Sequence, residues 1–487
     1  NQMGVTSKDQ LVFGLLDHTN FITHDIVNEA GADMDFKTRN LSVGAFTSAT
    51  LGYKQFAYLV VGGRNSWTST LEAANRSVFY PNISGSFIPT EAFEFLRNKK
   101  NVNYLKVRLG YSTAANFPGP YSTRAALNIS TRNFVNAAGA VINTNSIPNF
   151  LPNPNLKPEL MAETETGIEG KFFQSRLSTD ITLYQRVSND QILNRDLDPS
   201  TGYTSQQINA GKVTNKGVEA QLAYKIIRNK DWVWEVTGNW TINNSMVSDI
   251  PSDLKEIVYA GYTTLGNFAI NGQPLGIMKG YYYQRHENGQ LLVGAGGDYI
   301  ASTSIGIIGD PNPDYKLSGI NSITYKSLTF RFQVDYTHGG DMYSSTARSL
   351  LARGVTKDTE FDRAAPYILP GVTADGKPNN IQISATQGYF NNVFGPDQGG
   401  IFDATVVRLR DMSLSYALPE KLLNKTPFGS VSITANGSNL WYYAPNFPKY
   451  MNFDPETNGL GVGNGKGLEF ITGPSARRMG LSVRITF

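Results

Sequence analysis

The chain ends in the stretch Arg478–Phe487, RMGLSVRITF, in which apolar and polar side chains alternate up to the last residue. One face of an extended strand here carries Met479, Leu481, Val483, Ile485 and Phe487, and the other carries Gly480, Ser482, Arg484 and Thr486. A soluble sheet would turn the apolar face toward a core. An outer-membrane β-barrel also closes on such a strand, with the apolar face toward lipid and the polar face toward the lumen. The rest of the chain decides between these two structures.

The composition favours a β-rich wall and excludes a helical membrane protein. Charged residues make up 17%, aromatic residues 11%, and 47 of the 487 residues are glycine, whereas about a quarter of the residues in soluble proteins are charged. The mean hydropathy is −0.28, and no segment approaches the ~18 consecutive apolar residues of a transmembrane helix. The strands of a barrel need only ~9–11 alternating residues each, so a barrel agrees with these values.

Cysteine content, net charge and the N-terminal residues limit the kinds of site, partner and processing that the sequence allows. The sequence has no cysteine, which excludes disulfide frameworks and thiolate metal sites. A net charge of +3 over 487 residues argues against a nucleic-acid partner. The start, Asn1–Gly4, has neither the basic nor the apolar region of a secretory signal. We therefore expect a fragment, or a chain cleaved from a longer one.

Alternating segments recur along the chain, and the connections between them are short and long in turn. Long structureless loops count against a compact soluble domain, but they are typical of outer-membrane barrels, whose periplasmic turns are short and whose surface loops are long. The pattern predicts about fourteen strands, if a weak one near Leu11–Ile22 is included. A large β-sandwich is the alternative, and it leaves the loop asymmetry unexplained. The hairpins with short turns are expected at 41–60, 163–187, 218–242, 317–336 and 407–435.

Aromatic residues flank two of the short turns, as the interfacial girdle of a barrel requires. They are Tyr224, Trp232 and Trp234 at one turn, and Tyr325 and Phe330 at another. The sequence therefore predicts an all-β fold, a transmembrane antiparallel β-barrel with long extracellular loops.

Two local features interrupt the regular pattern. The apolar phase shifts at Arg410-Asp411, which predicts a β-bulge. The segment Asp341–Arg353 has the pattern of a short helix within a surface loop. Both features are expected to shape the end of the barrel that carries the long loops.

Several motifs together resemble the SusC-like TonB-dependent outer-membrane transporters of the Bacteroidota. They are NPNLKPE (153–159), NAGKVTNKGVE (209–219), GDPNPDYKLSGINSITY (309–325), VRLRDMSLSYALP (407–419), Asn439-Leu440, DPETN (454–458) and the closing LSVRITF. The resemblance runs from about Leu41 to Phe487. It implies a 22-stranded barrel, of which this chain would supply about fourteen C-terminal strands.

The resemblance also indicates what the chain lacks. The family's N-terminal plug, TonB box and extension domain have no counterpart in residues 1–487, which we expect to form the C-terminal part of a single outer-membrane barrel domain. Unpaired strand edges are costly in lipid. We therefore expect the remaining barrel and plug segment to come from an N-terminal piece, in the same gene product or in a separate chain.

No enzyme constellation, cofactor motif or metal site is recognisable in the sequence. His18, His24, His286 and His338 are scattered without the spacing of metal ligands. The glycine-rich stretch Gly459–Gly467 lacks the helix and the Ser/Thr of a phosphate-binding loop, so a flexible loop explains it better. We expect no catalytic activity and no cofactor.

Ligand recognition is expected from aromatic residues in loops and lumen, because flat rings suit both sugars and peptide side chains. Loop packing and partner contacts explain the same residues equally well. The candidates are Trp67, Tyr281, Tyr282, Tyr283, Tyr389, Trp441, Tyr442 and Tyr443. Charges expected on the lumen wall, or against a plug, are Arg108, Asp180, Glu219, Arg331, Asp335, Arg408 and Arg484. Phe487, the terminal aromatic residue, is the expected membrane-assembly signal.

The resemblance implies active import of an oligosaccharide or oligopeptide across the cell outer membrane. A SusD-like lipoprotein would cover the surface loops, TonB would act through the missing N-terminal region, and outer-membrane lipid would surround the multi-pass barrel. The alternative is a non-transporting SusC-like scaffold in a larger outer-membrane export or biogenesis assembly. An N-terminal piece with a TonB box and an intact plug would favour import. An open diffusion pore would require an empty lumen.

Overall fold

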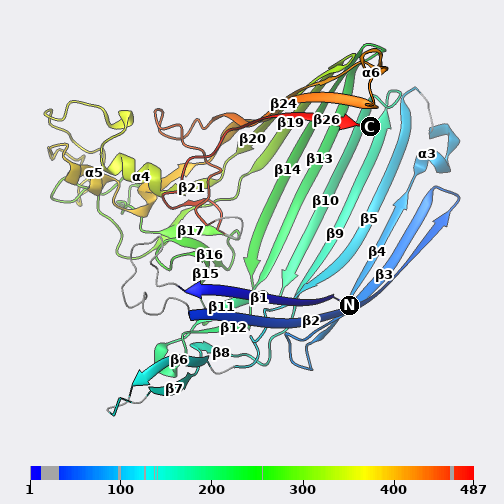
Figure 1. Cartoon of the computed structure of the whole chain (residues 1–487). Coiled ribbons are helices and arrows are strands. Elements are labelled where there is room, and N and C mark those ends of the chain that lie inside the picture. The colour runs from blue at the N-terminus through cyan, green and yellow to red at the C-terminus, as the bar shows by residue number, and fades with distance from the viewer. Residues whose placement is uncertain are drawn as a thin grey trace.

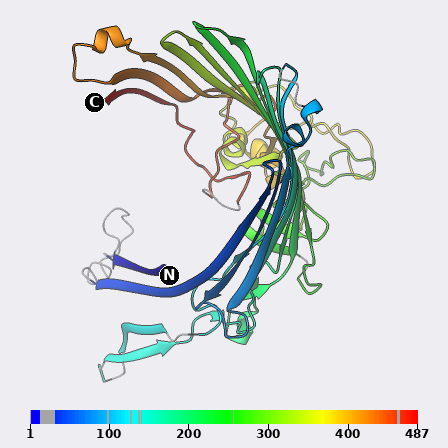
Figure 2. The same ribbon diagram turned by 90° about the vertical axis from the view of Figure 1, so that its right-hand side faces the viewer.

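The computed structural model describes residues 2–12, 32–96, 100–125, 128–135, 138–139, 141–254, 256–460 and 465–487. Its main feature is one 14-stranded sheet that curves into an open trough (Figures 1 and 2), with β1 and β26 as its edge strands. In order across the sheet the strands are β1 (Gln2–Val12), β2 (Ala32–Tyr53), β3 (Ala57–Thr68), β4 (Ser77–Phe87), β5 (Val102–Asn116), β9 (Glu159–Phe172), β10 (Leu177–Asn189), β13 (Lys212–Arg228), β14 (Trp232–Ser248), β19 (Tyr315–Tyr325), β20 (Leu328–His338), β23 (Val406–Ala417), β24 (Ser430–Tyr443) and β26 (Arg478–Thr486).

The strands pair antiparallel with their neighbours in chain order, which confirms the predicted all-β barrel fold. One end of the sheet carries tight turns at 54–56, 173–176, 229–231 and 326–327. The two other connections at this end contain α3 (Pro89–Ala92) with η1 (Glu94–Leu96), and α6 (Glu420–Leu423). The opposite end carries the long connections 117–158, 190–211, 249–314, 339–405 and 444–477. The first strand lies at Gln2–Val12, whereas most of its predicted span, 13–22, is outside the described residues.

The outer, convex face of the sheet is apolar across many strands. Cross-strand pairing places one apolar row side by side, made of Leu481, Ala435, Leu414, Phe330, Ile323 and Trp234. Leu481 is 74% exposed and Leu414 46% exposed. Large apolar side chains that stay exposed over a whole sheet face are the lipid-facing band of a barrel.

The inner, concave face is polar in the neighbouring register. The row beside the apolar one contains Ser482, Thr434, Ser415, Thr329 and Thr324. The hydroxyls of Ser415 and Thr434 lie 2.8 Å apart, and those of Thr324 and Thr329 lie 3.1 Å apart. The apolar residues of the alternating pattern therefore face lipid, and the polar residues face the lumen, as the closing stretch of the sequence indicated.

The predicted β-bulge in β23 is confirmed. Gln333 pairs with Asp411 and Val334 with Leu409, so Arg410 is the extra residue on its strand. The extra residue shifts the alternation by one position. As a result Arg408 and Arg410 stay on the inner face, while Met412 and the apolar residues after it face outward.

Gly217 in β13 lies where the wall has no room for a side chain. A Cβ atom there would lie 2.4 Å from the carbonyl oxygen of Ile242 and 2.5 Å from the ring of Tyr184, whose hydroxyl donates to Asn243 Oδ1 at 3.0 Å. We expect Gly217→Ala to destabilise the barrel by about 1–3 kcal/mol through overpacking. The measurement is the urea midpoint of unfolding in detergent. The matched control is Gly238→Ala in β14, where nothing lies within 4 Å, and equal midpoints for both variants would contradict the expectation.

The long connections fold into a layer of small sheets and helices at one end of the trough (Figure 1). The predicted helix at 341–353 is present as α4 (Ser345–Ala352), but its first residues form the strand β21 (Asp341–Ser344). Most fully buried apolar side chains lie in this layer or at the strand ends that meet it, in clusters that contain Val247, Met278, Met342 and Phe390. No helix among the described residues is long and apolar enough to cross a membrane. The other elements here are β6 (Asn128–Val135), β7 (Val141–Ser146), β8 (Phe150–Leu151), β11 (Ile192–Asp196), η2 (Pro199–Thr201), β12 (Ser205–Asn209), β15 (Glu256–Gly261), β16 (Gly266–Ile270), β17 (Ile277–Gly280), β18 (Gly306–Gly309), η3 (Lys357–Thr359), α5 (Gln387–Val393), η4 (Asp397–Gly400), β22 (Ile401–Asp403) and β25 (Leu468–Glu469).

Candidate functional site

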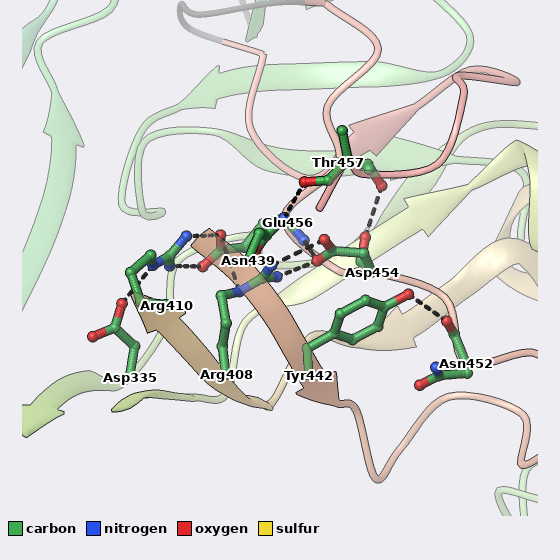
Figure 3. A network of polar contacts seen from close by, with 10 residues as sticks. Asp335, Arg408, Arg410, Asn439, Tyr442, Asn452, Asp454, Glu456 and Thr457 are labelled. Carbon is green, nitrogen blue, oxygen red and sulfur yellow. Dashed lines mark hydrogen bonds and ion pairs between the residues drawn. The ribbon is translucent and has the colours of Figure 1, made fainter. Parts of the chain in front are cut away.

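The connection between β24 and β26, of which the structure describes residues 444–460 and 465–477, crosses the concave side of the trough (Figure 2), and we call these residues the strap. Its first anchor is an ion pair between Arg408 of the wall and Asp454 of the strap. Arg408 is 1% exposed and Asp454 is 4% exposed. The two side chains meet through two contacts (Figure 3), one of them 3.1 Å from Arg408 Nη1 to Asp454 Oδ2. Arg408 also donates to Asn439 Oδ1 of β24. Loss of either residue would leave the charge of the other buried without a counter-charge, which is strongly destabilising.

A second, more accessible contact lies next to this anchor. Arg410 donates from Nη1 and Nη2 to the carboxylate of Glu456 in the strap, at 2.8 and 2.6 Å. Its Nε donates to Asp335 Oδ2 of β20 at 2.6 Å (Figure 3). Asp335 also accepts from Ser318 at 2.6 Å and from Gln333 at 2.9 Å. The Arg410 side chain is 34% exposed and that of Glu456 39%. This bidentate pair therefore stabilises the strap less than the buried pair of Arg408 and Asp454 does.

The other end of the strap is fixed by Glu469, which is fully buried. Its carboxylate accepts from the hydroxyl and the backbone N–H of Thr346, at 2.7 and 2.9 Å, and from the Ser344 hydroxyl at 2.9 Å. Ser344 in turn caps α4 by accepting from the N–H of Ala347 at 3.1 Å. Burial would raise the pKa of Glu469, but these hydrogen bonds lower it below its usual value. The strap therefore ties the barrel wall to the helix of a surface loop.

Two adjoining cavities lie between the strap and the inner wall, of about 480 Å³ and about 230 Å³. They share Lys316, Thr337 and Glu456, and we call them together the wall cavity. The strap contributes Pro455–Asn458, Lys466 and Gly467, and the wall contributes residues at the long-loop ends of β19, β20 and β23. This size suits a small ligand or one segment of a longer one. No group of three or more metal-ligating side chains occurs in the described part of the chain.

Three of the eight predicted ligand-binding aromatics lie on the outer face. Trp67 continues the outward register of Leu59 and Val61 in β3. Trp441 pairs with Leu409 and Tyr443 with Val407, on the apolar side of β23. Trp441 and Tyr443 are half exposed there, as aromatic residues of a membrane interface are.

The other five predicted aromatics lie in the loop layer or on the inner face. Tyr442 is on the inner face, with the Arg408 guanidinium 5.3 Å from its ring centroid and its hydroxyl donating to Asn452 O at 2.6 Å. Tyr283 and Tyr389 pack in loop clusters, where burial raises the pKa of Tyr283 to about 12. Tyr282 packs beside Met278, and Tyr281 is partly exposed. Ligand binding by the eight residues stays a prediction.

The predicted wall charges all lie in inward-facing register on the sheet. Arg108 contacts Glu169 and Asp180, both at 2.8 Å, and shares a polar concavity with Glu219. Asp335 and Arg408 belong to the network at the strap. Arg331 pairs with Ser413, and Arg484 pairs with Ser432.

Sequence reasoning missed several residues that the structure places at the strap and the wall cavity. Lys316, Glu456 and Lys466 were not recognised as site residues, and Asp454 appeared only within a family motif. A usable signal existed, because Arg408 and Arg410 are spaced like Asp454 and Glu456, two positions apart in each pair. Two matched pairs of opposite charge suggest two segments that lie side by side.

Comparison with known proteins places the chain in a family. Residues 4–440 match the family described as TonB dependent receptor-like, beta-barrel. TonB-dependent receptor P26 of Formosa agariphila is 25% identical over 472 residues, which are 91% of this chain and 46% of that protein. TonB-dependent receptor SusC of Bacteroides thetaiotaomicron is 23% identical over 317 residues, which cover 61% of this chain and 31% of SusC.

Solved structures agree on the fold. The RagAB peptide transporter has a TM-score of 0.71 at 20% identity, and the match covers 94% of this chain and 49% of that one. The chain spans about half the length of the first relatives, with 46% of P26 covered and 47% of TonB-dependent receptor P3, also of Formosa agariphila. These matches confirm the resemblance seen in the motifs. The chain belongs to the TonB-dependent receptor-like β-barrel family, as a SusC-like barrel of the bacterial outer membrane.

Proposed function

We propose that the chain is part of a TonB-dependent importer that carries an oligomeric nutrient, an oligosaccharide or an oligopeptide, across the outer membrane. The observation that carries this proposal is the wall cavity, which lies on the polar inner face and at the end of the sheet with the long loops. A ligand that enters from the cell surface would come in at the end of the sheet where this cavity lies. The relative named as a peptide transporter supports an oligomeric substrate.

The proposed importer needs further parts. In the described residues β26 pairs only with β24, and β1 pairs only with β2, so both edges are available to the remaining barrel segment. A plug would fill the polar trough and contact charges such as Arg108 and Asp180. A SusD-like lipoprotein would cover the long loops, and TonB would act through the N-terminal region.

The test is purification of the full-length protein from native outer membranes, with mass spectrometry of the associated proteins and of any retained peptide or glycan. We expect a SusD-like lipoprotein and a bound oligomer, and uptake of that oligomer should stop in cells without TonB. Stable association with several unrelated outer-membrane proteins, with no ligand and with TonB-independent function, would contradict import and favour a scaffold role.

A further inference from the structure

We propose that the wall cavity binds a charged segment of an oligopeptide, and that Lys316 and Lys466 hold its carboxylates. The proposal rests on the import function above and narrows the substrate class. It starts from the positions of the two lysines. Lys316 lies in inward register on β19, Lys466 belongs to the strap, and both residues line the wall cavity.

The two lysines have no ion-pair partner among the residues that the structure describes. Both residues are exposed. Three carboxylates at the strap are engaged with arginines, because Glu456 and Asp335 are held by Arg410 and Asp454 by Arg408. The ammonium groups are therefore free to pair with a ligand carboxylate.

The cavity also presents a carboxylate that could receive an amino group. Asp341 lines the cavity, and within the described residues its Oδ2 accepts one hydrogen bond, from the backbone N–H of Asp310 at 2.8 Å. A peptide carries amino groups and carboxylates together, so it matches a lining of both signs. An acidic oligosaccharide could satisfy the lysines but offers no cation to Asp341.

A neutral oligosaccharide fits this lining poorly. It would cover two ammonium groups without supplying a counter-charge, which is unfavourable. The lining also offers no aromatic platform for stacking on a sugar ring. Its one aromatic residue is Tyr336, which is in outward register with Leu317 and Val407 and whose hydroxyl lies 3.1 Å from His338 Nδ1.

The test measures binding to the full-length protein, purified with its partners. The probes are a tryptic digest of casein, maltoheptaose and trigalacturonic acid, and bound material is quantified by mass spectrometry after dialysis. In Lys316→Gln/Lys466→Gln we expect peptide binding to fall about 10–100-fold, the effect of losing charged hydrogen bonds. The control Lys377→Gln/Lys421→Gln removes the same charge from exposed positions outside the cavity and should bind as the unchanged protein does.

The other outcomes separate this proposal from the import function. Equal peptide binding by the cavity variant and the control would overturn the proposed site. Wild-type protein that retains only maltoheptaose or trigalacturonic acid, or none of the probes, would overturn the peptide assignment, and TonB-dependent uptake measured in cells would still decide import. Unchanged heat-modified mobility of the cavity variant on gels shows that its barrel has folded.

Discussion

Replacement of Arg408 by methionine should release the strap from the barrel wall. The substitution keeps much of the side-chain volume but leaves the Asp454 carboxylate buried without its cation, and breaking such a pair costs about 3–5 kcal/mol. Hydrogen exchange of strap amides, such as that of Glu456, which donates to Asp454 Oδ1 at 3.0 Å, measures the free energy of local opening. We expect the free energy of local opening to fall by about 3–5 kcal/mol, or to the detection limit.

Two further variants make this result specific. Arg410→Met removes the half-exposed contact with Glu456 and should lower protection by no more than about 1 kcal/mol. The double variant Arg408→Met/Asp454→Asn removes both buried charges and should regain part of the loss. Equal protection of the strap in Arg408→Met and Arg410→Met would contradict the assigned anchor.

The same anchor has a defined pH dependence. Burial would raise the pKa of Asp454, but hydrogen bonds from Arg408 and neighbouring groups bring it below its usual value. A depressed folded-state pKa contributes stability above the unfolded-state pKa of about 4, and this is lost as the pH falls through the folded-state value. Strap protection in the unchanged protein should thus be constant from neutral pH to about 5 and decline below about 4.

In Arg408→Met the pH dependence of strap protection should have the opposite direction. Without the guanidinium, burial dominates and raises the pKa of Asp454, so that protonation relieves an unpaired buried charge. Acidification should then strengthen the strap contact of the variant, whereas it weakens that of the unchanged protein.

The barrel could be predicted from the sequence because apolar and polar residues alternate within each strand. Alternation assigns each residue to lipid or lumen without knowledge of its neighbours. The bulge at Arg410 was visible for the same reason, since two arginines in inward register precede Met412 and Leu414 in outward register. Loop lengths then set the direction of every strand.

The site depended on information that alternation does not contain. Trp441, Tyr442 and Tyr443 form an unbroken aromatic run, so no period shows which rings face outward. Their faces follow from the register shift opposite Arg410, where Asn439 has a φ of +58°. The strap is placed by ion pairs between residues far apart in the chain, such as Arg408 and Asp454. The positions of Tyr283 and Tyr389 depend on the fold of the loop layer, which alternation does not predict.

Replacement of Leu414 by arginine should prevent stable assembly of the barrel. Leu414 lies in the half of β23 that leads to the short connection, beside Phe330 and Ala435 on the outer face, and is 46% exposed toward the lipid side. An arginine on the lipid face costs up to about 2–4 kcal/mol at the bilayer midplane and less toward the interfaces, whereas charges in the lumen are tolerated. The neighbouring Ser413 lies on the inner face opposite Arg331. Ser413→Arg is therefore the matched control.

The measurement is the amount of heat-modifiable, folded barrel in purified outer membranes, together with its urea midpoint after extraction. Leu414→Arg should give little folded protein or a midpoint lowered by the stated free energy, and Ser413→Arg should stay close to the unchanged protein. The reverse order would mean that the polar face meets lipid. That result would invert the faces of the sheet and remove the basis for a lumenal cavity, because the strap and the wall cavity lie on the Ser413 side.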